Sequence, residues 1–274
     1  MGPIGVFDSG VGGITVLKAL KATFPQENFL YLGDTARLPY GTKSPKTVFR
    51  YLTQNVEYLK QYDVKAVVVA CNSASSVLCP HHTFGVPVYG VIQPGANAAF
   101  AKTRTGRIGI LGTRTTVQSQ VYVKALKNLD PDLFTIQQAC PLLVPLVEEG
   151  WENDSITTEI IVKYLEEMKQ QNIDTLILGC THYPVVKETI QKVMGEHVQL
   201  IDSADAIAED LANDIAQGFL TFRPEHGGRI DVLATDDGAF FHHIASKLMN
   251  PFSINSWEMA DLRQVPEKRL YEDI

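Results

Sequence analysis

The chain has 274 residues, of which 45% are hydrophobic and 20% charged, as in an ordinary globular protein. This length predicts one large domain or two small ones, with a core that needs no disulfide bonds. The formal net charge of −7 argues against nucleic acid or an anionic membrane as a partner, because both attract basic surfaces. The sequence has no secretion signal and no apolar run of about 20 residues, so we expect a cytoplasmic protein with reduced thiols.

Short apolar runs alternate with helical patterns along the first third of the chain. Strands are predicted for residues 4–7, 29–32, 66–70 and 86–92, and helices for residues 12–24 and 47–62. Residues 66–70 are apolar without alternation, which is typical of a strand covered on both faces. Strands that alternate with helices predict a parallel sheet flanked by helices.

The same pattern returns later in the chain. Residues 108–111, 176–180 and 198–202 resemble, in the same order, residues 4–7, 67–71 and 88–92. Residues 231–234 and 239–249 follow both halves, and we expect them to complete the first domain. The predicted fold is α/β, with two similar parallel-sheet α/β domains in a pseudo-two-fold relation and the active site in the cleft between them. The first domain would hold residues 1–94 and 206–274, and the second residues 95–205.

The motifs of several common cofactor enzymes are missing. The sequence has no phosphate-binding GxxxxGK loop, no GxGxxG or GxSxG segment, no HExxH helix and no CxxC pair. The segment Cys79-Pro80-His81-His82 could suggest a metal cluster, but the end of a helix with surface imidazoles explains it better. We therefore expect chemistry carried by side chains, with no metal and no cofactor.

Two of the four cysteines occupy equivalent places in the two halves. Cys71 and Cys180 each follow a predicted strand, and sites in parallel α/β sheets form at the carboxyl ends of strands. Buried cysteines are often inert, but two thiols at matched strand ends beside polar residues favour a reactive pair. His182 lies close enough to Cys180 to assist its proton transfer. Cys79 and Cys140 lack this setting and are expected to pack in the interior.

Polar residues follow other predicted strands as well. The turn from Asp8 to Gly13 has glycines that permit close approach to a ligand. The alternative is a tight turn in which Asp8 or Ser9 caps the next helix. Asp34 opens a polar loop that also contains Arg37, and these two residues could simply pair with each other.

Five segments together resemble the glutamate racemases within the aspartate/glutamate racemase family. They are residues 8–13, 33–41, 70–74, 140–150 and 178–184, and the resemblance runs from Ile4 to about Asp210. It implies two α/β domains with the active site between them, often in a homodimer. It also implies an enzyme that interconverts L- and D-glutamate without a cofactor and supplies D-glutamate for the peptidoglycan of the bacterial cell wall.

The resemblance assigns roles to matching residues. Inversion at Cα requires removal of a proton from one face and delivery of a proton to the other. Cys71, assisted by Asp8, would act on D-glutamate, and Cys180, assisted by His182, on L-glutamate. The implied catalytic residues are Cys71, Cys180, Asp8, His182, Asp34 and Glu148, and the implied substrate-binding residues are Asp8, Ser9, Tyr40, Gly41, Asn72, Ser73, Thr181 and His182. Ser73 stands where the family usually has threonine, so the pocket lacks one methyl group.

Two other functions stay open from the residues alone. A related racemase that acts on aspartate or hydantoins would share the two-cysteine arrangement, and the sequence does not reveal the size of the pocket. A non-catalytic protein that binds or senses an amino acid could use the same scaffold. The matched pair of thiols disfavours this last function, because binding alone does not need two of them.

Overall fold

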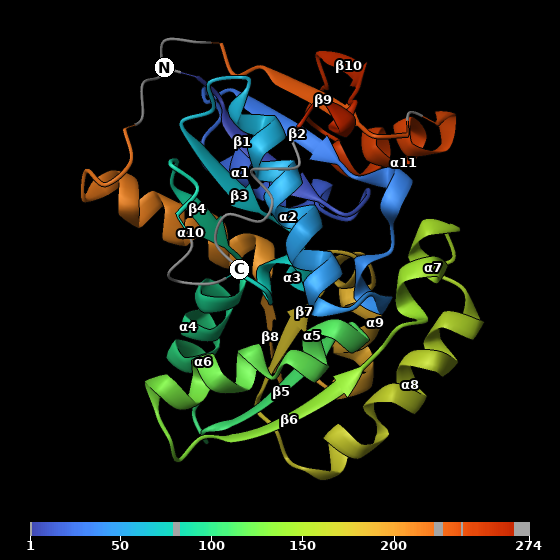
Figure 1. Cartoon of the computed structure of the whole chain (residues 1–274). Coiled ribbons are helices and arrows are strands. Elements are labelled where there is room, and N and C mark those ends of the chain that lie inside the picture. Colours follow the sequence, from blue (N-terminus) through green and yellow to red (C-terminus); the bar gives the residue numbers. More distant parts are fainter. Residues whose placement is uncertain (1, 79–82, 222–226, 237, 266–274) are drawn as a thin grey trace.

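The computed structural model describes residues 2–78, 83–221, 227–236 and 238–265. These residues form two parallel sheets, one above the other in Figure 1, and helices cover both faces of each sheet. No helix in the described ranges is long and apolar enough to cross a membrane.

Six parallel strands form the first sheet. Their spatial order is β10 (Ser256–Met259), β9 (Ile230–Ala234), β2 (Phe29–Gly33), β1 (Ile4–Asp8), β3 (Ala66–Val69) and β4 (Val88–Gly90). β1 and β3 are central and buried along their whole length, and all their side chains except Asp8 at the end of β1 are apolar or small. β9 and β10, from the end of the chain, extend this sheet beyond β2.

Four parallel strands form the second sheet. Their spatial order is β6 (Phe134–Ala139), β5 (Arg107–Gly112), β7 (Thr175–Gly179) and β8 (Gln199–Asp202). This order, 6-5-7-8, repeats the order 2-1-3-4 of the first sheet. The segments that resemble each other in sequence therefore form equivalent strands, which confirms the predicted α/β fold with two similar parallel sheets.

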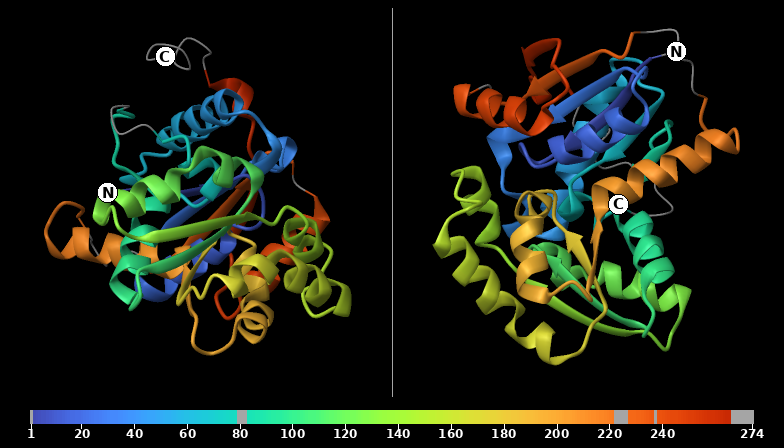
Figure 2. Two further views of the ribbon diagram at one scale, coloured as in Figure 1. Left: turned by 90° about the horizontal axis from the view of Figure 1, so that it is seen from below. Right: turned by 180° about the vertical axis from the view of Figure 1, so that it is seen from behind.

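Helices pack on both faces of each sheet, as Figure 2 shows from two further sides. On the first sheet, the helices are α1 (Ile14–Thr23), α10 (Ser203–Ala216) and α11 (Ala239–Met249) on one face and α2 (Pro45–Lys60) on the other. On the second sheet, they are α4 (Ile92–Lys102) and α6 (Val121–Leu129) on one face and α7 (Leu143–Glu148), α8 (Ser155–Gln170) and α9 (Lys187–Met194) on the other. Two short helices, α3 (Asn72–Ser75) and α5 (Arg114–Ser119), follow β3 and β5, and 3-10 turns span Thr35–Arg37, Tyr40–Thr42, Tyr183–Val186 and Leu262–Gln264.

Two predicted elements are shorter than expected. The helix predicted for residues 12–24 begins only at Ile14, because the preceding glycines form the turn that leaves β1. The strand predicted for residues 86–92 shrinks to β4, because the chain already enters α4 at Ile92. The other predicted strands and helices lie within about two residues of their expected ends, as is usual for such boundaries.

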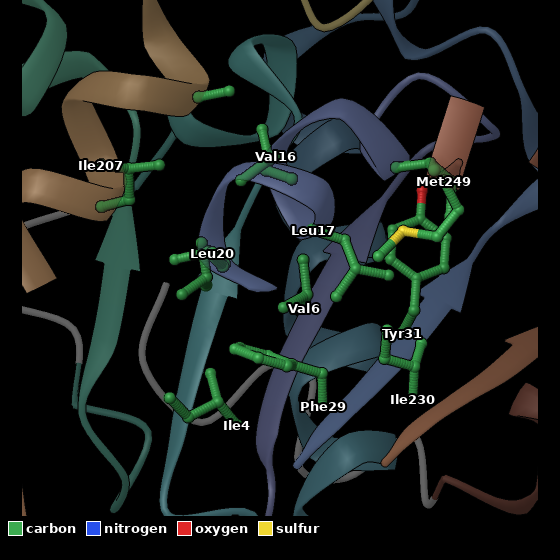
Figure 3. Packing of buried hydrophobic residues seen from close by; sticks show 14 of the residues in the cluster. Ile4, Val6, Val16, Leu17, Leu20, Phe29, Tyr31, Ile207, Ile230 and Met249 are labelled. Atoms are coloured by element: carbon green, nitrogen blue, oxygen red, sulfur yellow. The ribbon is translucent and has the colours of Figure 1, made fainter. Parts of the chain in front are cut away.

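Helix α10 joins the two halves of the molecule. It packs against α1 beside the first sheet and against α4 beside the second. Figure 3 shows Ile207 of α10 beside Val16 and Leu20 of α1, above Phe29 of the first sheet. All four side chains are at least 99% buried, so the contact contributes the hydrophobic free energy of a core.

Truncation of Ile207 tests the importance of this contact. We expect Ile207→Ala to lower the free energy of unfolding by about 2–5 kcal/mol, because the cavity that it leaves can close only in part. Urea unfolding followed by circular dichroism measures the change. The matched control is Ile156→Ala on α8, where the side chain is 48% exposed and the expected loss is below about 1 kcal/mol. Equal losses in the two variants would contradict a special role for the contact of α10 with α1.

Candidate active site

The carboxyl ends of the two sheets face each other across a cavity. Parallel α/β sheets usually bind ligands at this edge, because polar side chains gather in the loops that follow the strands. The predicted site residues that line the cavity are Ser9, Tyr40, Gly41, Cys71, Asn72, Ser73, Cys180, Thr181 and His182. The other lining residues are Pro39, Thr42, Thr113, Pro141, Val144 and Pro145. Both halves of the chain thus contribute to one site, and the two predicted thiols meet there.

Cys71 reaches the cavity from the first sheet. It follows β3 and has only 5% of its surface exposed. Its thiol donates to Ser9 Oγ at 3.7 Å and also hydrogen-bonds Asp8. Burial, together with the negative charge of Asp8, raises the pKa of Cys71 to about 12. This thiol therefore keeps its proton at neutral pH.

Cys180 reaches the cavity from the second sheet, directly after β7. Its Sγ lies 3.9 Å from Nδ1 of His182, and Nε2 of His182 lies 3.1 Å from Oε1 of Glu148. Burial alone would lower the pKa of His182, but the hydrogen bonds to Cys180 and Glu148 outweigh burial and raise this pKa to about 10. A protonated His182 can stabilise a thiolate at Cys180 or return a proton to it.

The two thiols have opposite electrostatic surroundings, although they occupy equivalent strand ends. The carboxylate of Asp8 lies beside Cys71, whereas the imidazolium of His182 lies beside Cys180. Cys71 thus keeps its proton, whereas Cys180 has the His182 ring as its hydrogen-bond partner. A proton can leave a carbon on one face and return on the other only if such a donor and acceptor are present together.

Asp8 lies behind the cavity wall and is completely buried. Its Oδ2 accepts a hydrogen bond from the Gly10 backbone N–H at 2.9 Å, and its Oδ1 accepts one from Thr181 Oγ1 at 3.4 Å. Burial raises the pKa of Asp8, although the positive charge of His182 opposes the rise. Asp8 does not line the cavity, so it reaches a substrate through Cys71 rather than directly.

Asp34 and Glu148, which the resemblance places in the catalytic set, also lie one layer behind the cavity. Asp34 is fully buried and pairs with Arg37 at 2.7 Å, which is the pairing that the sequence left open. It also accepts hydrogen bonds from Tyr40 Oη and from Thr235 Oγ1. Asp34 therefore holds in place the Tyr40 side chain of the cavity wall. Glu148 acts in the same indirect way, because its partner is His182.

A row of hydroxyl groups crosses the cavity wall from one half to the other. Ser73 Oγ lies 2.9 Å from Thr113 Oγ1, which lies 3.1 Å from Thr116 Oγ1. The backbone at Gly41 packs against Thr113, since a methyl group at Gly41 would lie 2.7 Å from its Cβ. Thr113 is a lining residue that was not among the predicted site residues. The sequence places Thr113 at the end of a predicted strand, as it does the two cysteines, but gives it no role in the site.

The remaining cysteines do not face the cavity where the structure describes them. Cys140 is completely buried in the core formed with α7 and α8, which agrees with its predicted packing role. Cys79, together with Pro80, His81 and His82, lies outside the described residues. Within the part of the chain that the structure describes, no group of three or more His, Cys, Asp or Glu side chains could hold a metal ion.

Comparison with known proteins identifies the family. Residues 13–211 match the model of the Asp/Glu/Hydantoin racemase family. The chain belongs to this family. A glutamate racemase of Geobacter metallireducens is 44% identical to the chain over 248 residues, which cover 90% of this chain and 92% of the relative.

Solved racemase structures have the same architecture. A glutamate racemase isoform from Bacillus anthracis superposes with a TM-score of 0.89 and 39% identity, covering 95% of this chain and 98% of the other. The glutamate racemase of Francisella tularensis, solved in complex with D-glutamate, gives a TM-score of 0.87 and 31% identity, with 96% and 98% covered. These matches span both sheets, and they confirm the racemase family predicted from the five sequence segments.

Glu148→Gln tests the electrostatic partnership of His182. Because the Glu148 carboxylate helps to raise the pKa of His182, its loss should lower that pKa from about 10 toward the ordinary histidine value. An NMR pH titration of the His182 ring in labelled protein measures the shift. Glu149→Gln is the matched control, because Glu149 is the exposed neighbour in sequence and should leave the titration unchanged. A His182 pKa that does not respond to Glu148→Gln would contradict the partnership.

Gly12→Ala tests the close contact between the two halves. A methyl group at Gly12 would lie 2.3 Å from Thr181 Oγ1 and 2.5 Å from His182 Cε1, so His182 must move or the cleft must open. We expect racemase turnover to fall about a hundredfold, because displacement of a reacting group by about 1 Å can cost that much. In the control Gly10→Ala, the nearest atom belongs to Leu38 at 3.4 Å, so most of the turnover should remain. Full activity of Gly12→Ala would show that His182 does not depend on this contact.

Proposed function

We propose that the chain is a glutamate racemase that interconverts L- and D-glutamate through two cysteines and without a cofactor. The observation that carries this proposal is the presence of Cys71 and Cys180 on opposite sheets of one buried cavity. Relatives that match about nine-tenths of the chain at 43–44% identity are themselves named glutamate racemase.

The surroundings of the thiols support a defined proton path. In the direction from L- to D-glutamate, the Cys180 thiolate, paired with the His182 imidazolium, removes the Cα proton. The Cys71 thiol then gives its proton to the opposite face of Cα, and the negative charge moves to Cys71. In the reverse direction Cys71 is the base, and the neighbouring Asp8 assists it in releasing its proton. In each turnover the enzyme accepts one proton from Cα and gives one proton back, so the total charge of Cys71 and Cys180 is unchanged.

The cavity wall supplies neutral groups suited to the carboxylates of glutamate. Ser73 and Thr113 carry hydroxyl groups that can donate hydrogen bonds, and Tyr40 and Gly41 bring backbone close to the same place. Because the Cα proton of an amino acid is only weakly acidic, fixed dipoles and exclusion of water must lower much of the barrier. The two cysteines are 5% exposed, which fits such a closed site.

The alternative functions receive less support. An aspartate racemase of Picrophilus torridus superposes with a TM-score of 0.56 at 19% identity, a likeness that concerns the fold alone. A protein that only binds an amino acid would not need the opposed environments of Cys71 and Cys180.

We also propose that the chain acts as a homodimer in the cytoplasm and supplies D-glutamate for peptidoglycan. The resemblance to the family supports these three points. The molecule that the chain binds is a small amino acid, its substrate. The net charge of −7 disfavours nucleic acid as a further partner.

Racemisation in deuterium oxide tests the two-base path. Because separate thiols serve the two faces, L-glutamate at early times should give D-glutamate labelled at Cα, while recovered L-glutamate stays unlabelled. Proton NMR and chiral chromatography, without added pyridoxal phosphate, measure both pools. A double variant Cys71→Ala, Cys180→Ala should lose all exchange, and the control Cys140→Ala should keep the labelling pattern. Equal early labelling of both pools, or exchange in the double variant, would contradict the proposal.

A further inference from the structure

Asn72 has a buried amide oxygen that lacks a hydrogen-bond partner. The residue lines the cavity and is 2% exposed, and Oδ1 accepts no hydrogen bond from any described residue. An unpaired buried carbonyl costs free energy, so an unpaired carbonyl on a residue that lines a binding cavity points to a donor supplied by a ligand.

A chain of hydroxyl groups holds the other end of the same amide. Asn72 Nδ2 donates to Tyr122 Oη at 2.8 Å and approaches Ser203 Oγ at 3.4 Å. Tyr122 itself hydrogen-bonds Ser203, and Ser203 Oγ donates to the carbonyl oxygen of Leu178 at 2.8 Å. Because the single proton of Ser203 is used on Leu178, Ser203 can only accept from its other neighbours. The amide must therefore present its NH₂ group to this chain and its oxygen elsewhere.

The groups that orient Asn72 are closely packed and belong to segments around the second sheet. Tyr122 lies on α6, Ser203 begins α10, and both are buried. The Tyr122 ring fits tightly against Gly179, where an added methyl group would lie 3.1 Å from the ring. Asn72 follows β3 of the first sheet, so its orientation is set from across the cleft.

We propose that Tyr122 and Ser203 are positioning residues that turn the Asn72 carbonyl toward the ammonium group of the substrate. The proposal rests on the proposed function, which supplies an α-amino acid as the substrate. A carbonyl oxygen only accepts hydrogen bonds and repels carboxylates, whereas an ammonium group only donates. Glutamate has one such donor group, and it is bonded to Cα, the carbon that reacts. Fixing the ammonium group therefore helps to align the Cα–H bond between the two thiols.

Tyr122→Phe tests the proposal through two ligands that differ in the ammonium group. D-glutamate carries this group, and glutarate has the same two carboxylates without it. We expect Tyr122→Phe to weaken binding of D-glutamate about tenfold, as for loss of a hydrogen bond to a charged group, and to leave binding of glutarate unchanged. Calorimetric titration with each ligand measures both constants. In kinetics, KM for glutamate should rise by a larger factor than kcat falls.

Further variants separate positioning from packing. Ser203→Ala should also weaken binding of D-glutamate and leave binding of glutarate unchanged. In a chain that already carries Asn72→Ala, Tyr122→Phe should not weaken binding of D-glutamate further, because the amide that Tyr122 orients is gone. The control Tyr58→Phe removes the hydroxyl group of a buried residue on α2, which contacts Tyr62, and should change the binding of neither ligand.

The outcomes distinguish this proposal from the proposed function. Equal weakening of D-glutamate and glutarate in Tyr122→Phe would assign Tyr122 to packing alone and overturn the positioning role. Unchanged binding of both ligands would overturn it as well. If the unaltered chain fails to exchange the Cα proton of glutamate, the proposed function falls, whereas selective weakening of D-glutamate would still support the orientation of Asn72.

Discussion

The buried imidazolium of His182 is the charge around which the two halves are arranged. A charged group that is only 6% exposed needs partners, because its hydration is lost. Cys180 and Glu148 supply hydrogen bonds from the second half, and Asp8 supplies negative charge from the first. Moving the sheets apart would separate the charges of Asp8 and His182. The contact of the loop at Gly12 with the His182 ring follows from this requirement.

The repeated strand order explains why two thiols oppose each other, but it does not explain how they differ. Equivalent places after β3 and β7 bring Cys71 and Cys180 to facing edges of the two sheets. The difference comes from their neighbours, an aspartate on one side and a histidine on the other. With equivalent neighbours the two thiols could still share a single proton, but neither would be preferred as the acid, whereas Asp8 makes Cys71 the thiol that keeps its proton. The departure from symmetry therefore determines which thiol holds the proton before substrate binds.

Patterns along the sequence predict the elements that are uniformly apolar and the residues at their ends. The strands around Cys71 and Cys180 are of this kind, and so both thiols could be placed before the structure was known. β6 was not predicted, because Gln137 and Gln138 interrupt its apolar pattern. The role of Tyr122 was also beyond the sequence, since an aromatic residue on a helix resembles any core residue until its hydroxyl partners are seen. Such partners lie far apart in the chain, and only tertiary contacts bring them together.

Some polar groups at the site are held by hydrogen bonds from the opposite half of the chain. Asn72 takes its orientation from Tyr122, and Asp8 accepts a hydrogen bond from Thr181. Thr15 in turn donates to the Thr181 carbonyl oxygen at 3.0 Å. Separation of the two halves would break these hydrogen bonds together, and Asn72 would lose the partner that orients its amide. An acidic protein can thus bind an acidic substrate through oriented neutral groups, which are assembled only while water is excluded.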